Sequence, residues 1–173
     1  MACRVHSGIT CSVPTASSRL IEIPPIARIL PHRYPLLLVD RIIEFEPNKR
    51  IVGIKQVTHG EPNLAKQRNG LFVIPPTIVM EAVAQVGAVL VLASPENHGR
   101  IPYLVGMDRV RNRRVVRAGE TLHIEVTVQK LRETMGRMAG LVTVEGETIA
   151  RGVVIFALGP PPEGSADVQV RRG

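Results

Sequence analysis

The sequence contains no tryptophan, and aromatic residues make up only 3% of its 173 positions. A hydrophobic core must therefore be built from aliphatic side chains, which supply most of the 45% hydrophobic content. In a chain of this length, that content is enough for one domain of ordinary size that needs no disulfide or metal cross-link.

Cysteine is almost as scarce. Cys3 and Cys11 both lie close to the N-terminus, so no cysteine pair brackets the core. No Cys/His spacing suits a zinc site, and we expect neither a metal nor a cofactor. The N-terminus also lacks the unbroken apolar run of a secretory signal. The small number of cysteines is typical of a protein in a reducing compartment. Together with the missing secretory signal, it predicts a cytoplasmic protein.

A membrane-spanning run is missing as well. Residues 71–93 are strongly apolar, but Pro75, Pro76, Glu81 and Gln85 interrupt them. A span of about 20 apolar residues seldom carries a carboxylate near its middle. The segment is therefore interpreted as a buried helix, and we expect no association with a membrane.

Hydrophobic periodicity and turn residues predict one domain over residues 21–158. It lies between a disordered tail at 1–20 and a flexible tail at 159–173, neither of which has a sustained period. The expected elements are a short helix at 24–30, strands at 36–45 and 50–58 joined by a turn at 46–49, a loop at 59–75, a long helix at 76–94, and strands at 103–112, 121–132, 137–144 and 147–158.

The long helix determines the expected architecture. Glu81 is its only charged residue, so apolar groups lie on nearly every side and the helix must be buried almost all round. A strongly curved antiparallel sheet wrapped around one helix achieves that burial. We therefore predict an α+β fold in which about six strands wrap a long central helix.

Glu81 is the first candidate for chemistry. A carboxylate on an otherwise apolar helix is costly unless it is paired or neutral. Gln85 follows one turn later on the same face, where it can orient Glu81 or a bound water. The alternative is that Glu81 reaches a surface arginine or lies at a dimer seam. The pattern alone leaves both interpretations open.

Three motifs extend this interpretation. They are Leu30–Arg41 (LPHRYPLLLVDR), Glu81–Gln85 (EAVAQ), and Tyr103 with Gly106–Asp108 and the arginine-rich run after it. Together they resemble the FabZ-type 3-hydroxyacyl-acyl carrier protein dehydratases, over about residues 26–158. The resemblance implies a hot-dog fold, a role in fatty acid or related acyl-chain biosynthesis, and acyl carrier protein or an acyl thioester as partner. It also implies a homodimer with two shared active sites, commonly assembled as a hexamer.

The resemblance further implies which residues form the site. In this family a loop histidine takes the C2 proton, the helix glutamate acts on the departing hydroxyl, and a glycine N–H holds the thioester oxygen. Glu81 and Gln85 match this pattern, whereas Gln67 stands at the base position and Pro76 at the glycine position. Substrate-binding positions fall on Gly70, Val73, Pro76 and Tyr103.

Both replacements remove a chemical function. A glutamine amide has no accessible pKa for proton abstraction, and proline has no N–H to donate. A general base contributes about 10²–10⁴-fold in rate, and an oxyanion donor about 10²–10³-fold. We therefore predict weak or absent dehydration, as in a pseudoenzyme or a heteromer with an active paralogue.

Other histidines offer a weak substitute for the missing base. His59 precedes the loop and could swing in, although a solvated turn residue is the more common role at such a position. His32 is expected to pack and form hydrogen bonds, and His123 to face solvent. An active dehydratase or a hot-dog thioesterase that relies on Glu81 is the main alternative function.

Positive charge dominates the chain, with 22 Lys and Arg against 15 Asp and Glu. Such a charge favours an acidic partner. One run concentrates it, through Arg109, Arg111, Arg113, Arg114 and Arg117. It is either a solvated strand edge or a docking surface for acidic carrier protein or the phosphate of its pantetheine arm. A nucleic-acid-binding module is less well supported, because aromatics and recognisable nucleic-acid motifs are both lacking.

Overall fold

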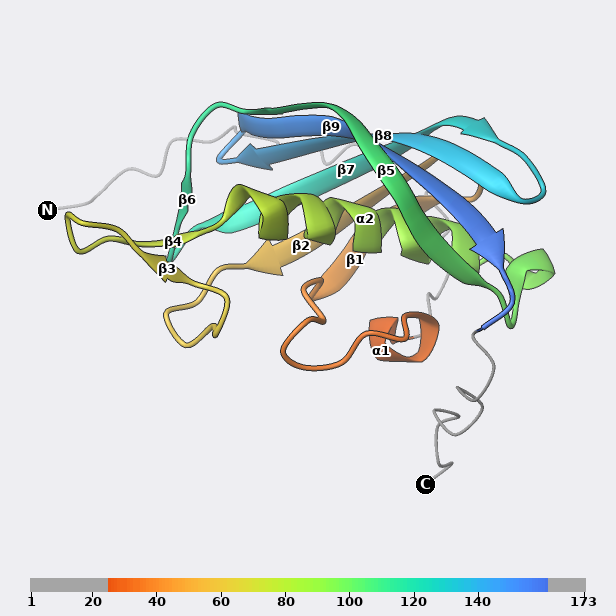
Figure 1. Ribbon diagram of the computed structural model, residues 1–173, viewed down its shortest axis with the longest axis horizontal. Helices are drawn as coiled ribbons and strands as arrows, with labels where there is room; N and C mark the ends of the chain where they lie inside the picture. The colour runs from red at the N-terminus through yellow and green to blue at the C-terminus, as the bar shows by residue number, and fades with distance from the viewer. Residues whose placement is uncertain (1–24, 162–173) are drawn as a thin grey trace, which may run out of the picture.

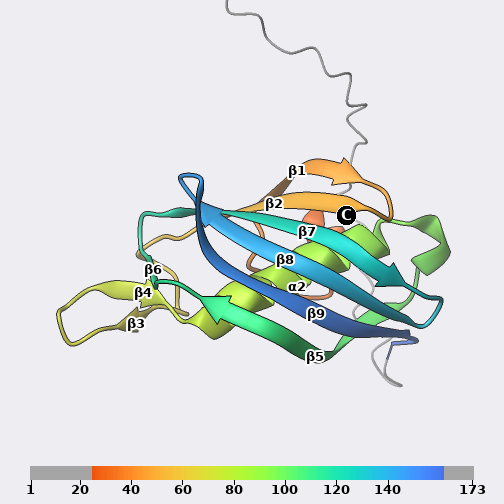
Figure 2. The same cartoon turned by 90° about the horizontal axis from the view of Figure 1, so that it is seen from above.

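A six-stranded antiparallel sheet curves around the long helix α2 and covers one side of it (Figure 1 and Figure 2). A computed structural model describes residues 25–161. The strand order is β1-β2-β7-β8-β9-β5. The elements are α1 (Ile26–Ile29), β1 (Arg41–Glu46), β2 (Arg50–Gln56), β3 (Ala65–Lys66), β4 (Phe72–Ile74), α2 (Pro76–Leu92), a 3₁₀ turn (Pro95–Asn97), β5 (Ile101–Asn112), β6 (Val116–Arg117), β7 (Thr121–Leu131), β8 (Met135–Val144) and β9 (Glu147–Gly159).

The architecture predicted from the apolar helix is confirmed. Pro76 occupies the first turn of α2, where its missing N–H leaves no hydrogen bond unmade. The helix ends at Leu92, and Pro95 then begins a short 3₁₀ turn. Twelve of the 17 residues of α2 are buried, and β2 and β7 contact the helix directly. The apolar core thus lies between α2 and the concave face of the sheet.

Two glycines allow the helix to approach the sheet closely. A Cβ atom added to Gly140 of β8 would lie 2.2 Å from Cγ1 of Val83, and one added to Gly87 of α2 would lie 2.6 Å from Cε of Met138. Real Cβ contacts are essentially never that short. The absence of a side chain at these two positions therefore sets the spacing between α2 and β8.

The first strand begins later than predicted. Residues 36–40 are not part of β1, which starts at Arg41. The N–H groups of Leu36 and Leu37 donate to the carbonyl of Arg33 in a turn, and the N–H of Leu38 donates to the side chain of Gln85. These three donors are used in a turn and a side-chain contact, so the apolar run at 36–39 does not extend the sheet.

The prediction of a plain loop at 59–75 is wrong. Strands β3 and β4 form a hairpin there, and β6 pairs with β4 to complete a small three-stranded sheet. Figure 1 shows this hairpin projecting beyond the N-terminal end of α2. Strands of two or three residues are too short to produce a recognisable alternation of apolar and polar side chains.

The remaining turns and strands follow the pattern in the sequence. Glu145 and Gly146 have φ values of 50° and 82°, as a tight turn between β8 and β9 requires. Strand β9 includes Gly159, the first residue of the predicted flexible tail. The predicted N-terminal tail at 1–20, the first four residues of the predicted domain and residues 162–173 lie outside the described part. Within residues 25–161, no helix is both long and apolar enough to span a bilayer.

Candidate functional site

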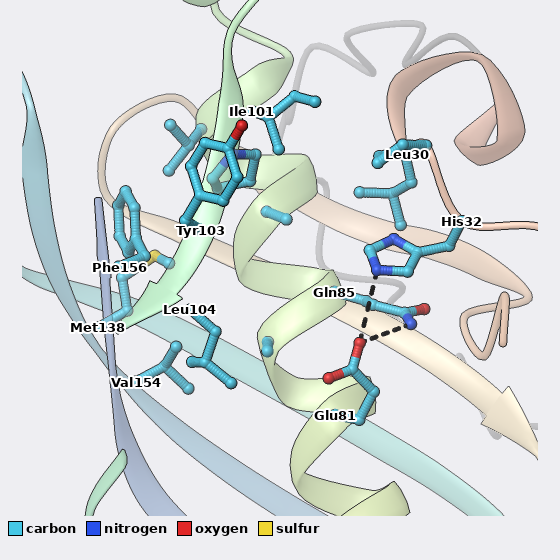
Figure 3. Close-up of a pocket in the computed structure, with 15 residues that line it drawn as sticks. Leu30, His32, Glu81, Gln85, Ile101, Tyr103, Leu104, Met138, Val154 and Phe156 are labelled. Atoms are coloured by element: carbon cyan, nitrogen blue, oxygen red, sulfur yellow. Dashed lines mark hydrogen bonds and ion pairs between the residues drawn. The ribbon is translucent and has the colours of Figure 1, made fainter. Parts of the chain in front are cut away.

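A pocket of about 240 Å³ opens along α2, between the helix and the part of the sheet that ends at β5 (Figure 3). Three parts of the chain form its walls. They are the segment after α1, one face of α2, and the strands β5, β8 and β9. Most of the lining is apolar, and the polar side chains of His32, Glu81 and Gln85 gather at one end.

The face of α2 that lines the pocket follows the helical repeat. Glu81, Ala84, Gln85 and Ala88 are separated by three or four positions, so they project from one side of the helix. The two alanines leave space above the helix backbone, which becomes the floor of the pocket. Leu104 of β5, with Val154 and Phe156 of β9, forms the opposite apolar wall.

Gln85 fixes the polar end of the pocket. Its side chain is almost fully buried, with 1% of the residue exposed. Its Oε1 accepts the N–H of Leu38 at 2.9 Å, and its Nε2 donates to the carbonyl of Leu36 at 2.7 Å and to Oε1 of Glu81 at 3.0 Å. The amide therefore joins α2 to the segment before β1 and holds the Glu81 carboxylate at the same time.

The Glu81 side chain is neither fully buried in the core nor fully exposed to solvent. Its side chain is 27% exposed and faces the pocket. Its polar contacts within residues 25–161 are with Gln85 and His32, so the described structure does not show the surface arginine considered as an alternative partner. The carboxylate thus keeps access to a ligand in the pocket.

His32 was missed as a site residue by the sequence reasoning. It was expected to pack and form hydrogen bonds, but its Nδ1 is buried without a partner in the described structure. Its Nε2 lies 3.7 Å from Oε1 of Glu81, across the polar end of the pocket. Nothing in the local sequence pattern signals this contact, because residues 32 and 81 meet only after α2 packs against the segment following α1.

Tyr103 lines the apolar part of the pocket, as expected for a substrate-binding residue. Its hydroxyl donates to the carbonyl of Pro160 at 2.7 Å, which orients the ring across the pocket (Figure 3). The neighbouring lining residues on β5 and β8 were not predicted. Their contribution depends on the strand order, which the sequence pattern does not reveal.

Four other predicted positions lie away from this pocket in the single chain. None of Gln67, Gly70, Val73 and Pro76 is among the pocket-lining residues. Gln67 is in the β3–β4 hairpin, where its N–H donates to the carbonyl of Leu71 at 2.8 Å. Val73 is buried in β4 beside β6. One chain therefore does not bring residue 67 into the pocket that holds Glu81.

The two remaining described histidines from the sequence analysis are on the surface. His59 is exposed, and its ring meets the edge of Phe72 with centroids 5.9 Å apart. His123 is exposed on β7. Neither lines the pocket, so His32 is the histidine in residues 25–161 that faces Glu81 there.

The arginine-rich run contains four exposed side chains and one half-buried side chain, and the exposed Arg109 pairs with Asp108 through its Nε at 3.3 Å. Arg109, Arg111, Arg113 and Arg117 are exposed. Arg114 is half-buried and donates to both carboxylate oxygens of Glu120 at 3.0 Å, and this hydrogen bonding raises the pKa of its guanidinium. Arg114 therefore supports the local fold, while the other four form an exposed cationic surface.

Metal ligands do not gather in the described structure, where no three His, Cys, Asp or Glu side chains cluster.

Comparisons with known proteins agree with this geometry. The FabA-like domain matches residues 30–153. A protein of Desulforamulus reducens named 3-hydroxyacyl-[acyl-carrier-protein] dehydratase FabZ is 49% identical over 140 residues, covering 81% of this chain and 99% of the relative. The protein of the same name from Thermomicrobium roseum is 46% identical over 142 residues, covering 82% and 95%.

Solved structures support the fold. The dehydratase heterocomplex ApeI:P from Xenorhabdus doucetiae aligns with a TM-score of 0.70 at 20% identity, covering 80% of this chain and 93% of that one. A hypothetical thioesterase protein from Streptococcus pneumoniae, solved with coenzyme A, aligns with a TM-score of 0.55 at 11% identity, covering 69% and 85%. At these identities the likeness shows the fold alone, which is the hot-dog fold.

Proposed function

Because the chain belongs to the FabA-like family and is related to the FabZ 3-hydroxyacyl-[acyl-carrier-protein] dehydratases of fatty acid biosynthesis, we propose that it binds acyl thioesters of acyl carrier protein in the Glu81 pocket. The observation that carries the proposal is the form of this pocket. An apolar channel along α2 ends at a carboxylate, an amide and an imidazole. An acyl chain fits the first part, and the polar atoms near its thioester fit the second.

Dehydration by this chain alone is proposed to be weak or absent. Gln67 stands at the family's base position and Pro76 at the position of its oxyanion donor. Gln67 cannot take a proton near neutral pH, and Pro76 has no N–H to donate. The single chain also offers no histidine from the β3–β4 hairpin to the pocket. Glu81 is therefore the main proton-transferring group that this chain contributes.

The active site is proposed to be shared between two chains. Strand β5 forms one edge of the sheet and exposes Tyr103, Leu104 and Val105. A second copy, or a paralogue that keeps a histidine at the position of Gln67, would cover this edge and bring its own hairpin to the Glu81 pocket. A homodimer is the simplest assembly, and a trimer of dimers or a heteromer would preserve the same contact.

Carrier protein is proposed to dock on the exposed arginines of β5, of β6 and of the segment between them. Arg109, Arg111, Arg113 and Arg117 present guanidinium groups that pair well with carboxylate and phosphate oxygens. The protein would act in the cytoplasm without a cofactor. A role as a nucleic-acid-binding module has less support, since the aromatic residues that stack bases are few.

An active enzyme is the second candidate. One oxygen of the Glu81 carboxylate is held by Gln85, and the carboxylate faces the pocket with 27% of the side chain exposed. A carboxylate in that setting can transfer protons in a dehydratase or activate water in a thioesterase. This candidate needs no residue at the position of Gln67.

The test compares wild type with the double variant Gln67→His, Pro76→Gly in hydration of a crotonyl thioester. We expect wild-type turnover near the uncatalysed background and a clear gain in the double variant. Calorimetric titration with a non-hydrolysable acyl thioether analogue measures binding separately. Robust wild-type hydration would favour the second candidate, and failure of both proteins to bind the analogue would contradict the proposed function.

A further inference from the structure

A second pocket of about 240 Å³ lies at the end of the sheet where β7 turns into β8. This hollow, the outer pocket, shares no lining residue with the Glu81 pocket. Figure 2 looks onto the outer face of the sheet, with α2 behind it. The lining residues are Lys130, Arg132, Met135, Gly136, Arg137 and Ile155.

The alternation of side chains along β8 and β9 separates the two pockets. Met138 and Phe156 line the Glu81 pocket from the inner face of the sheet. Their neighbours Arg137 and Ile155 are partners in the β8–β9 ladder and point to the opposite face, where both line the outer pocket. A chain that pairs with the β5 edge extends the sheet sideways, so the outer face stays open to a ligand.

Positive charge surrounds the outer pocket. Arg137 donates to Asp108 at 2.7 Å, so its charge is compensated. Lys130 and Arg132 are exposed, and neither forms an ion pair within residues 25–161. Glu133, in the turn between β7 and β8, is not part of the lining. The pocket thus offers the charges of Lys130 and Arg132 to a ligand.

The guanidinium of Arg137 is held in place with donors to spare. Its Nε donates to Oε1 of Gln129 at 3.2 Å, and its Nη2 donates to Oδ2 of Asp108. In the described part of the chain Nη1 makes no hydrogen bond. Arg137 can therefore donate to an anion in the pocket without giving up the contacts that orient it.

Apolar side chains complete the lining. Met135 is a large hydrophobic residue with 46% of its surface exposed, and Ile155 is half-buried beside it. Gly106 of β5 is the ladder partner of Ile155, and nothing lies within 4 Å of a Cβ added to this glycine. The pocket is therefore open toward β5, and its lining combines cations with an uncovered apolar surface.

We propose that the outer pocket binds a small organophosphate, with the phosphate between Lys130 and Arg132 and a short carbon chain against Met135 and Ile155. A phosphate monoester carries close to two negative charges at neutral pH, which matches the two uncompensated cations. Arginine also pairs well with phosphate oxygens. The volume is below the range of about 300–1,000 Å³ for drug-sized ligands, so a small molecule fits better than a whole nucleotide cofactor.

This site is independent of the proposed acyl-thioester binding, because it lies on the other face of the sheet. A soluble organophosphate and a phospholipid headgroup share the same chemistry. The hollow form of the site favours the soluble ligand, since a flat membrane surface would not fill it. Butyl phosphate and vesicles containing phosphatidic acid are therefore the two probes that distinguish the sources.

Methyl NMR of the full-length protein locates the ligand. We expect butyl phosphate to shift the methyl signals of Met135 and Ile155 and to leave those of Met138 and Val154, which line the Glu81 pocket, in place. Inorganic phosphate should cause the same shifts at higher concentration, and butanol should cause none. Prior saturation with the acyl thioether analogue should leave the butyl phosphate titration unchanged.

Variants of exposed residues test the contacts without disturbing the fold. Lys130→Gln with Arg132→Gln should weaken butyl phosphate binding by about tenfold at low salt, because two charge pairs are lost. Arg41→Gln with Lys49→Gln is the matched control, since it removes the same charge from exposed positions at the β1 edge and should bind normally. Met135→Ser should weaken butyl phosphate by about threefold and leave inorganic phosphate unaffected.

Five results would overturn the proposal. They are an absence of shifts at Met135 and Ile155, displacement of butyl phosphate by the acyl thioether analogue, equal weakening in the two double variants, equally tight binding of butanol, and binding of the vesicles without binding of butyl phosphate. Equal weakening would indicate attraction by net charge, and vesicle binding alone would indicate a membrane-contacting surface. Thermal unfolding of each variant confirms that a lost signal reflects lost binding.

Discussion

Nε2 of Gln85 lies 3.0 Å from Oε1 of Glu81 while the same amide holds the backbone of residues 36 and 38. One side chain therefore supports the fold and orients the carboxylate. The Leu30–Arg41 motif packs against α2 through this amide, because Gln85 holds the backbone of residues 36 and 38 in that motif.

Replacement of Gln85 tests this double role. Gln85→Ala leaves the buried N–H of Leu38 and the carbonyl of Leu36 without partners, so we expect a loss of about 2–4 kcal/mol in the free energy of unfolding. Urea denaturation measures it. The exposed Gln129→Ala on β7 is the matched control and should change stability by no more than about 0.5 kcal/mol. Equal effects would mean that the Gln85 contacts carry little energy.

A substitution on the floor of the pocket tests acyl binding without altering the polar groups at its end. Ala84→Leu places a larger side chain in the channel, and we expect affinity for a thioether analogue to fall by about tenfold or more. Ala139→Leu is the control, because Ala139 is half-buried on the other face of β8 from Met138, which lines the pocket. Calorimetry should show normal binding by the control. Unimpaired binding by Ala84→Leu would place the acyl chain elsewhere.

The spacing between α2 and β8 predicts a stability effect at Gly140. A Cβ added there would lie 2.2 Å from Val83, so Gly140→Ala should destabilise the protein by about 1–3 kcal/mol through overpacking. Gly60→Ala is the matched control, since nothing lies within 4 Å of its added Cβ. Thermal unfolding of the two variants measures the difference. A stable Gly140→Ala protein would show that the helix can shift outward without cost.

Acid stability should depend on a cross-strand ion pair. Arg137 donates to Asp108 at 2.7 Å and, together with Arg109, lowers the pKa of this carboxyl below its ordinary value of 3.8. A depressed pKa stabilises the fold above pH 3.8, and the contribution disappears as the pH falls through the folded-state value. Wild type should therefore exceed Asp108→Asn in urea midpoint at neutral pH, and the difference should vanish in strong acid. A constant difference would exclude this linkage.

Carrier-protein docking is tested by charge reversal. Arg111→Glu with Arg113→Glu should weaken carrier-protein binding by about tenfold at low salt, with a smaller effect at high ionic strength. Arg41→Glu is a suitable single-site control, because Arg41 is exposed on β1 at the opposite edge of the sheet. Surface plasmon resonance at two salt concentrations measures both. Equal losses from Arg41→Glu would indicate attraction by net charge alone.

The fold was predictable because the strongest pattern in the sequence is also its central element. An almost uniformly apolar helix with one carboxylate at Glu81 requires an enclosing sheet, and the alternation at 121–132 supplies a clear strand of that sheet. The β3–β4 hairpin was not predictable, since its strands are too short to show a period. The start of β1 was misplaced because the apolar run at 36–39 packs through Gln85 rather than through the sheet.

The site was only partly predictable for a related reason. Glu81, Gln85 and Tyr103 were identified from the helix pattern and the resemblance, and all three line the pocket. His32 joins them through a tertiary contact between segments 49 positions apart, which no local spacing encodes. The roles of Gln67 and Pro76 stay predictions, since the residues that would meet them belong to a second chain in the proposed assembly.

The two outer strands of the sheet also bear on how the protein avoids aggregation. The ladder of β5 is irregular between Leu104 and Gly106 and again between Asp108 and Arg111, and that of β1 is irregular between Ile42 and Glu44. Such bulges distort the row of amides and carbonyls that a fibril would extend. The irregular edges β1 and β5 therefore disfavour the repeated addition of strands by which a fibril grows. The stretch of β5 between its two irregularities is left for the second chain of the proposed dimer.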